Sequence, residues 1–124
     1  MSTVELTAET FADTIAGNDL VLIDFWASWC GPCRVFGPIY ERVAERTPDA
    51  VFAKVDTEAQ QELAAAFRIM SIPTLMVFRE GVLVYAQPGA LPEAALEELI
   101  EKARALDMDE VRAAATDEEL RQPA

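Results

Sequence analysis

The feature that most constrains the fold is the apolar run from Leu20 to Ala27 (LVLIDFWA), in which Asp24 is the only charged residue. A strand with apolar side chains on both sides must be covered on both faces, as the inner strands of α/β proteins are. The breaker sequence Gly17-Asn18-Asp19 comes directly before it. The sequence therefore predicts a central strand over 20–27 with further layers on either side.

Other segments have the periodicity of helices. The first helix has Thr7 as a plausible N-cap, and the last has Pro92 in its first helical position, where a missing N–H costs nothing. The helices are expected over residues 7–15, 33–46, 60–67 and 91–106.

Three more strands are expected, over residues 51–56, 74–79 and 82–86. Only Glu80 and Gly81 separate the last two, and so short a connection predicts an antiparallel hairpin. Strands alternate with helices early in the chain and form a hairpin late. The predicted fold class is therefore α/β, with a central mixed β-sheet flanked by helices on both faces.

A single domain is expected over residues 1–106, followed by an acidic C-terminal tail over 107–124 that is partly helical or disordered. Val111 and Ala113 to Ala115 are compatible with a restarted helix, but few bulky apolar residues are available to anchor it. A solvated tail is favoured, and a tail docked on the domain is the alternative.

The net charge of −12 opposes binding to nucleic acid or anionic lipid, because the ten basic residues are scattered singly. This acidity predicts a soluble monomer, with an acidic face for a basic partner as the alternative. No apolar run approaches the roughly 20 residues of a membrane-spanning helix. The N-terminus, MSTVELTAET, has no features of a secretory signal, so a cytoplasmic location is expected.

Three features of the composition narrow the possible chemistry. The chain has no histidine, which excludes Cys–His and Ser–His nucleophile pairs. It has two cysteines, so one chain cannot build a four-ligand Cys/His zinc site. The five glycines are isolated, so no phosphate-binding loop is present. Cysteine redox chemistry and carboxylate chemistry remain.

The segment Trp29-Cys30-Gly31-Pro32-Cys33 lies where the buried strand ends and the second helix begins. Two cysteines three positions apart at a helix start can reach bonding distance with little backbone movement. The helix N-terminus favours a thiolate at Cys30, and Cys33 is expected to be better shielded. Cys30 is thus the predicted nucleophile and Cys33 the resolving thiol. The alternatives are a structural disulfide, half of a metal site shared with another chain, or inert thiols.

At this point the chain resembles the thioredoxin family over roughly residues 4 to 106. The resemblance is carried by DFWASWCGPC at 24–33, Pro38, AKVD at 53–56, SIPT at 71–74, the hairpin glycine Gly81 and PGAL at 88–91. It implies the thioredoxin fold and a thiol–disulfide oxidoreductase whose redox group is a Cys30–Cys33 disulfide, with no further cofactor and no metal.

The resemblance places Asp24 where the family keeps a buried carboxylate beneath the dithiol. Asp24 shares a strand face with Leu22 and Trp26, so its pKa should be raised. Such a carboxylate can take the proton of Cys33 through water, and Lys54 would tune it. The alternative is a carboxylate neutralised by Lys54 that has no other role.

Pro73 stands where the family has a cis-proline facing the dithiol, although Ile72-Pro73 could instead be a trans bond that starts a strand. A cis bond would leave the backbone of the preceding residue free to pair with an extended substrate. Trp29 is expected to cover the nucleophile, or else is a plain surface aromatic. The resemblance implies an apolar docking rim made by Trp29, Gly31, Pro32, Ile72, Pro73, Gly89 and Ala90.

The expected activity is reduction of protein disulfides. Gly31-Pro32 favours a reductant, because oxidase and isomerase relatives often place a histidine between the cysteines. The partners implied are an NADPH-dependent flavoenzyme, thioredoxin reductase, and disulfide-containing client proteins. A redox-independent binding or adaptor module that uses the apolar rim is the alternative. Met70 and Ser71 replace an Arg-Gly pair of many bacterial relatives, which puts the partner preference in doubt.

Overall fold

The computed structural model describes residues 2–121, with side-chain surroundings up to residue 114. The elements in chain order are β1 (Thr3–Glu5), α1 (Ala8–Gly17), β2 (Leu20–Trp26), α2 (Gly31–Glu45), β3 (Val51–Asp56), α3 (Gln61–Ala66), β4 (Thr74–Arg79), β5 (Val82–Pro88), α4 (Glu93–Ala105) and α5 (Met108–Arg121).

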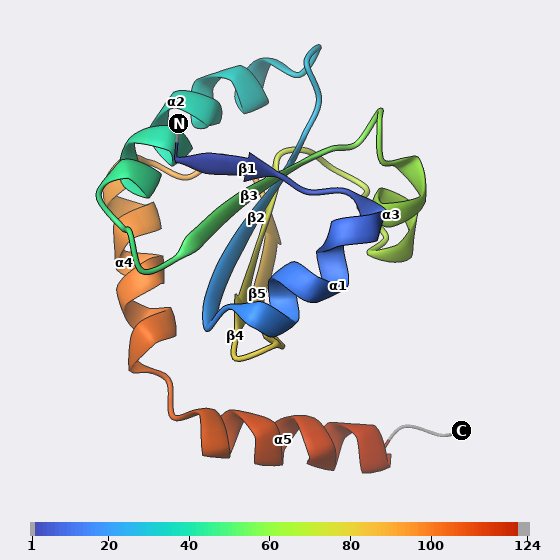
Figure 1. Ribbon diagram of the computed structural model, residues 1–124, viewed down its shortest axis with the longest axis vertical. Coiled ribbons are helices and arrows are strands. Elements are labelled where there is room, and N and C mark those ends of the chain that lie inside the picture. The colour runs from blue at the N-terminus through green and yellow to red at the C-terminus, as the bar shows by residue number, and fades with distance from the viewer. Residues whose placement is uncertain (1, 122–124) are drawn as a thin grey trace.

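The strands form one mixed sheet in the order β1-β3-β2-β4-β5, with β2 in the middle (Figure 1). β3 is parallel to both of its neighbours, whereas β4 is antiparallel to β2 and to β5. Residues 20–25 are buried along the whole of β2. The predicted central strand and the predicted mixed α/β sheet are both confirmed.

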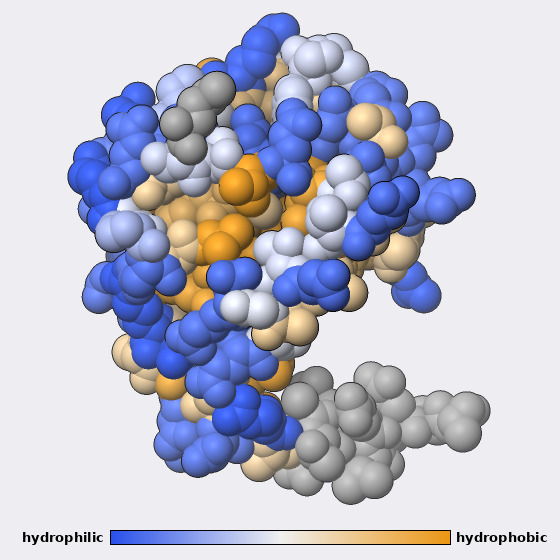
Figure 2. Space-filling view, viewed as in Figure 1, coloured by the Kyte–Doolittle hydropathy of each residue, from blue (hydrophilic) through white to orange (hydrophobic). Residues whose placement is uncertain are grey.

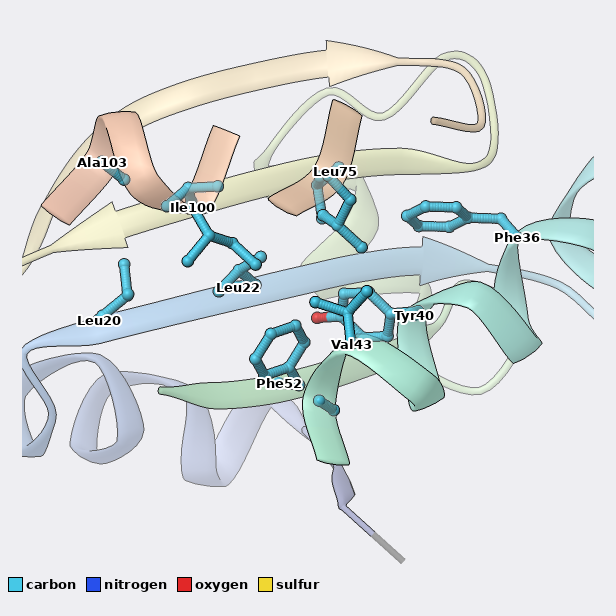
Figure 3. Packing of buried hydrophobic residues seen from close by; sticks show 12 residues of the cluster. Leu20, Leu22, Phe36, Tyr40, Val43, Phe52, Leu75, Ile100 and Ala103 are labelled. Carbon is cyan, nitrogen blue, oxygen red and sulfur yellow. The ribbon is translucent and has the colours of Figure 1, made fainter. Parts of the chain in front are cut away.

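Helices cover both faces of this sheet, as expected: α2 and α4 lie on one face, and α1 and α3 lie on the other (Figure 1). Alternate residues of β2 point to opposite faces, so Leu22 packs under α2 and α4 while Ile23 packs under α1 and α3. Figure 3 shows the first of these clusters, with Phe36, Tyr40 and Val43 of α2 packed against the sheet. The helix that carries the cysteines is therefore anchored by its buried side.

β1 is the strand that the sequence pattern does not predict. It has only three residues and pairs in parallel with β3, with Val4 opposite Ala53. Val4 is 48% exposed at the sheet edge. In Figure 2 the hydrophobic colour gathers in the middle of the face on which β1 lies, inside a hydrophilic ring. A strand of three residues is too short to show the alternation of apolar and polar residues by which longer strands are predicted.

Two helix starts differ from the expected positions. α2 begins at Gly31 rather than Cys33, and Pro32 is accommodated in its first turn, where a missing N–H is not needed. α4 begins at Glu93, with Pro92 as its extended N-cap, so the expectation that Pro92 is the first helical residue is wrong. The earlier start of α2 makes Cys30 its N-cap.

α5 follows α4 after a short break and extends beyond the sheet (Figure 1). Asp107 Oδ1 accepts hydrogen bonds from the N–H groups of Asp109 and Glu110, at 3.0 and 3.3 Å. Met108 is buried, and Arg112 forms an ion pair with Glu80 of the β4–β5 turn at 3.0 Å. The start of α5 is thus attached to the domain, and the division of the chain at residue 106 stays a prediction.

Candidate active site

Cys30 and Cys33 lie at the junction between β2 and α2, and they are joined as a disulfide with their Cα atoms 5.2 Å apart. Cys30 is the N-cap of α2, and its Sγ accepts the backbone N–H of Cys33 at 3.2 Å. The free N–H groups and the dipole of a helix N-terminus stabilise negative charge at such a position. The N-cap position of Cys30 is therefore one that suits a negatively charged sulfur.

Exposure does not distinguish the two cysteines, because each is 4% exposed. The expectation that Cys33 is better shielded is therefore not supported by the buried area. Their surroundings do differ. Cys30 Sγ lies 3.6 Å from the carbonyl oxygen of Ile72, whereas Cys33 lines a pocket with Lys54.

The Ile72-Pro73 peptide bond is cis, as the resemblance implies. Within the described residues, no hydrogen bond occupies the N–H of Ile72, and the carbonyl oxygen of Pro73 accepts the N–H of Gly89 at 2.8 Å. This second bond places the loop at Gly89 against the cis-proline loop. A backbone donor at Ile72 and an acceptor at the same residue are thus available beside Cys30.

The residues expected to form the docking rim are not equally accessible. Trp29, Gly31, Pro32, Gly89 and Ala90 are exposed, and Ile72 is half-buried. Pro73, in contrast, is buried. The accessible part of the rim is therefore made by its neighbours.

Trp29 is held by a residue that the sequence does not single out. Its side chain is 64% exposed, and the indole N–H donates a hydrogen bond to Glu58 Oε1 at 2.6 Å. Asp56 Oδ1 in turn accepts the N–H of Glu58 at 2.9 Å, which orders this turn after β3. Because Trp29 and Glu58 meet only when β2 and β3 pair, no local pattern marks Glu58. That Trp29 covers Cys30 stays a prediction.

Asp24 is completely buried in the middle of β2, and neither of its carboxylate oxygens has a hydrogen-bond partner among the described residues. Burial raises the pKa of Asp24 from 3.8 to about 7, and the positive charge of Lys54 partly opposes this. Burial also raises the pKa of Tyr40, and the charge of nearby Asp24 raises it further. Asp24 is thus a carboxyl group that changes its protonation state near neutral pH.

Lys54 lies opposite Asp24 in the β2–β3 pairing, but it donates no hydrogen bond to the carboxylate. Its Nζ lies 4.7 Å from the centre of the Trp26 ring, a cation–π contact. Trp26, Lys54 and Cys33 together line a pocket of about 350 Å³ that Gly37 and Glu41 close from α2. The pocket therefore extends from Cys33 to Lys54, whose positive charge acts on Asp24.

The structure contains one redox group, the Cys30–Cys33 disulfide. In the part of the chain that the structure describes, no three His, Cys, Asp or Glu side chains are grouped to hold a metal ion. Over the same residues, no helix is both long enough and apolar enough to cross a membrane.

Comparison with known proteins agrees with this geometry. A family model described as Thioredoxin matches residues 2–102. Putative thioredoxin 2 of Streptomyces coelicolor is 66% identical over 118 residues, which cover 95% of this chain and 88% of that protein. The bifunctional thioredoxin reductase/thioredoxin of Mycobacterium leprae is 43% identical over 96 residues, covering 76% of this chain and 21% of that protein.

A solved structure has the same fold. A mutant thioredoxin from Halobacterium salinarum superposes with a TM-score of 0.77 and 39% sequence identity, and the match covers 85% of this chain and 94% of that one. With its CxxC pair in disulfide contact at the start of α2, the chain belongs to the thioredoxin family and is a thiol–disulfide oxidoreductase that reduces protein disulfides.

Proposed function

We propose that Cys30 attacks the disulfide of a client protein and that Cys33 resolves the mixed disulfide that results. The observation that carries this assignment is the position of Cys30 as the N-cap of α2, where its sulfur accepts the N–H of Cys33. The N-terminus of a helix stabilises negative charge, which favours the thiolate of Cys30 as the attacking nucleophile.

The electrons balance over two exchange steps. The Cys30 thiolate bonds to one client sulfur, and the client S–S bond breaks. The other client sulfur leaves as a thiolate and takes up a proton. The Cys33 thiolate then attacks Cys30 Sγ, which closes the Cys30–Cys33 disulfide and releases the second client thiolate. Two electrons pass from the protein to the client.

Asp24 accepts the proton of Cys33 before the second step. Its pKa of about 7 supports this role, because the group can take and return a proton at neutral pH. The pocket lined by Cys33 and Lys54 is large enough for water, which would carry the proton between the buried carboxylate and the thiol. Lys54 favours the ionised form of Asp24 and thereby tunes its affinity for the proton.

The client chain docks in an extended conformation against Ile72, whose N–H has no other partner in the described residues. Exposed Trp29, Gly31 and Pro32 flank the sulfurs on one side, and Gly89 and Ala90 flank them on the other. Buried Pro73 holds the loop that presents Ile72. Backbone pairing accepts many sequences, which suits an enzyme that reduces diverse client proteins.

The oxidised protein is returned to the dithiol by thioredoxin reductase, an NADPH-dependent flavoenzyme, and needs no cofactor of its own. The Mycobacterium leprae relative supports this partner, because its name joins a thioredoxin reductase and a thioredoxin in one protein. Such a cycle belongs in a reducing compartment, and we place the protein in the cytoplasm as a monomer.

The roles of the two cysteines are separated by the variants Cys33→Ser and Cys30→Ser. Each variant is incubated with a disulfide-containing client, quenched with acid and examined by mass spectrometry without reductant. We expect Cys33→Ser to accumulate a one-to-one mixed disulfide through Cys30, because its second step is blocked. The matched variant Cys30→Ser should form little adduct. An adduct that forms faster on Cys33 than on Cys30 would reverse the assignment.

A further inference from the structure

Most basic side chains of this acidic protein are neutralised by ion pairs. Of the ten lysines and arginines, Arg121 lies beyond the described side chains. The paired residues are Arg42, Arg46, Arg79, Lys102, Arg104 and Arg112. Among the described side chains, those without an ion pair are Arg34, Lys54 and Arg68. Three cations in the described part of the chain are thus without an ion pair.

Two of the three unpaired cations lie beside the dithiol, where Arg34 and Lys54 line a pocket together with Cys33. Arg34 directly follows Cys33 and donates a hydrogen bond to the carbonyl oxygen of Ser28 at 3.3 Å. Lys54 lines the pocket that contains Cys33. Arg68 lies on the opposite side, in the loop between α3 and the cis-proline. Cations without an ion pair therefore lie beside Cys33, at Arg34 and Lys54, and in the loop before the cis-proline, at Arg68, although the net charge of the protein is −12.

Arg68 lines a pocket of about 230 Å³, which we call the Arg68 pocket. Its walls are mainly apolar and include Phe67, Met70, Met76 and Pro88. The guanidinium has no hydrogen bond or ion pair among the described residues. The pocket thus combines apolar walls with one unpaired positive charge, which is a suitable environment for an apolar side chain next to a carboxylate.

The Arg68 pocket shares wall residues with a second hollow that lies beside the site of disulfide exchange. Met70 and Ser71 line both, and the second hollow, of about 190 Å³, reaches Trp29 and Ile72. Ile72 in turn contacts Cys30 Sγ through its carbonyl oxygen, at 3.6 Å. Met70 is 91% exposed between the two hollows. A client chain that pairs with Ile72 and continues toward α3 would pass Met70 to reach Arg68.

The backbone at Arg68 has a conformation that side chains disfavour. Its φ angle is +54°, in the left-handed region where glycine is the residue without strain. This conformation belongs to the C-terminal cap of α3, in which the N–H of Arg68 donates to the carbonyl of Ala65 at 3.0 Å and the N–H of Ile69 donates to that of Ala64 at 3.0 Å. The cap uses backbone groups only, so the Arg68 side chain has no part in closing α3.

We propose that Arg68 is a specificity-determining residue that binds a carboxylate of the client polypeptide, with an adjacent apolar client side chain in the Arg68 pocket. This inference rests on the proposed docking of clients along Ile72. The inference predicts a preference for acidic clients. The net charge alone predicts the opposite, because a protein with a net charge of −12 should repel acidic clients. Charges beyond about 8 to 10 Å are screened at physiological salt, so the local arginine decides the preference.

The test uses synthetic peptides that each contain one intramolecular disulfide and a constant leucine beside a single Glu, Gln or Lys. This pair is moved from about two to about six residues from the reacting cysteine, which an extended chain spans in about 7 to 20 Å. For each peptide kcat/KM is measured, and the Gln peptide serves as the internal reference for each variant. The variants are Arg68→Gln, Arg68→Gly and Arg68→Glu, with Lys102→Gln as the control that removes the same charge on distant, exposed α4.

In the wild type we expect one spacing at which the Glu peptide is reduced about two- to fivefold faster than the Gln peptide, with the difference lost at high salt. The preference should vanish in Arg68→Gln and Arg68→Gly, reverse in Arg68→Glu and persist in Lys102→Gln. A Glu/Gln ratio of one or less at every spacing, or a ratio unchanged by the Arg68 variants, would overturn the inference. Failure of the proposed docking would appear differently, as equal rates for peptides and for an uncharged dialkyl disulfide in every variant.

Discussion

Asp24 makes the stability of the protein depend on pH. Its pKa is about 7 in the folded protein but close to 3.8 when the chain unfolds, so between these values the folded state holds more protons. The free energy of unfolding therefore falls as pH rises from about 4 to about 7, and it levels off above that. About three pKa units correspond to about 4 kcal/mol. The proposed proton acceptor thus destabilises the protein at the pH at which it works.

The variant Asp24→Asn should remove this loss of stability. We expect its free energy of unfolding at pH 8 to exceed that of the wild type by about 4 kcal/mol, because the amide carries no charge to bury. At pH 4 most of the difference should be gone, since the wild-type carboxyl group is then neutral in the folded protein and only about half ionised in the unfolded chain. The measurement is denaturant unfolding of the oxidised proteins between pH 4 and pH 9. A difference that stays constant over this range would show that the Asp24 pKa is not raised.

The same substitution should slow the closing of the Cys30–Cys33 disulfide. In a rapid-mixing experiment the rate at which the mixed disulfide resolves is followed against pH. The wild type should show an inflection near pH 7, from ionisation of Asp24, and Asp24→Asn should lack it. If both profiles had the same inflection, the proton acceptor would be another group.

The N-terminal cap of α1 offers a prediction that does not involve the active site. Thr7 caps α1: its Oγ1 accepts the N–H of Thr10, and the Thr10 hydroxyl accepts the N–H of Thr7. Thr7→Ala should therefore lower the free energy of unfolding by about 1 kcal/mol. The matched control is Thr14→Ala in the same helix, which removes only a bond to the Thr10 carbonyl and should leave stability unchanged or slightly higher. Equal losses in both variants, measured by urea unfolding, would contradict the capping role.

The elements that can be predicted from the sequence are those whose patterns are local and long. β2 is apolar on both faces, and the two-residue connection at Glu80 and Gly81 determines the hairpin. β1 cannot be predicted in this way, because three residues at a sheet edge carry no period. The start of α4 differs by one position from the expected one, since Pro92 satisfies the requirements of both the N-cap and the first turn.

The candidate site likewise contains residues that the sequence predicts and contacts that it does not. Cys30, Cys33 and Pro73 belong to sequence motifs, so their positions beside one another follow from the family resemblance. The bond between Trp29 and Glu58 and the pocket at Arg68 depend instead on how separate loops meet after the sheet forms. No feature of the chain near these residues predicts such contacts.

At the scale of the whole molecule, the arrangement of layers explains why the site is rigid on one side and adaptable on the other. α2 is fixed to α4 by a shared apolar cluster (Figure 3) and by ion pairs from Arg42 and Arg46 to Glu93. The cysteines therefore sit on a firmly held helix. The surfaces that face a client, at Trp29, Ile72 and Met70, belong to loops. Fixed sulfurs with loop-borne contacts suit one chemistry applied to many clients.

The C-terminal segment determines where the catalytic domain ends. We propose that residues 1–106 form the domain and that 107–124 are an acidic extension of it. The alignment with the Streptomyces coelicolor relative includes 118 residues and 95% of this chain, so it continues well past residue 106. Met108 in the first turn of α5 is 5% exposed, whereas residues 109–114 are half-buried or exposed, so the contribution of α5 to stability should come mainly from its first turn.

Deletion of 107–124 should therefore lower the free energy of unfolding by about 2 kcal/mol, the cost of exposing what Met108 covers, and leave disulfide reduction within about twofold of the full chain. Met108→Ala in the full chain should reproduce most of this loss. The Arg112–Glu80 pair is exposed and should add little. The measurements are urea unfolding and the kcat/KM for a client disulfide. A truncated protein that is stable but inactive would show that α5 belongs to the catalytic domain, because the loss would then arise from missing contacts with the client rather than from unfolding.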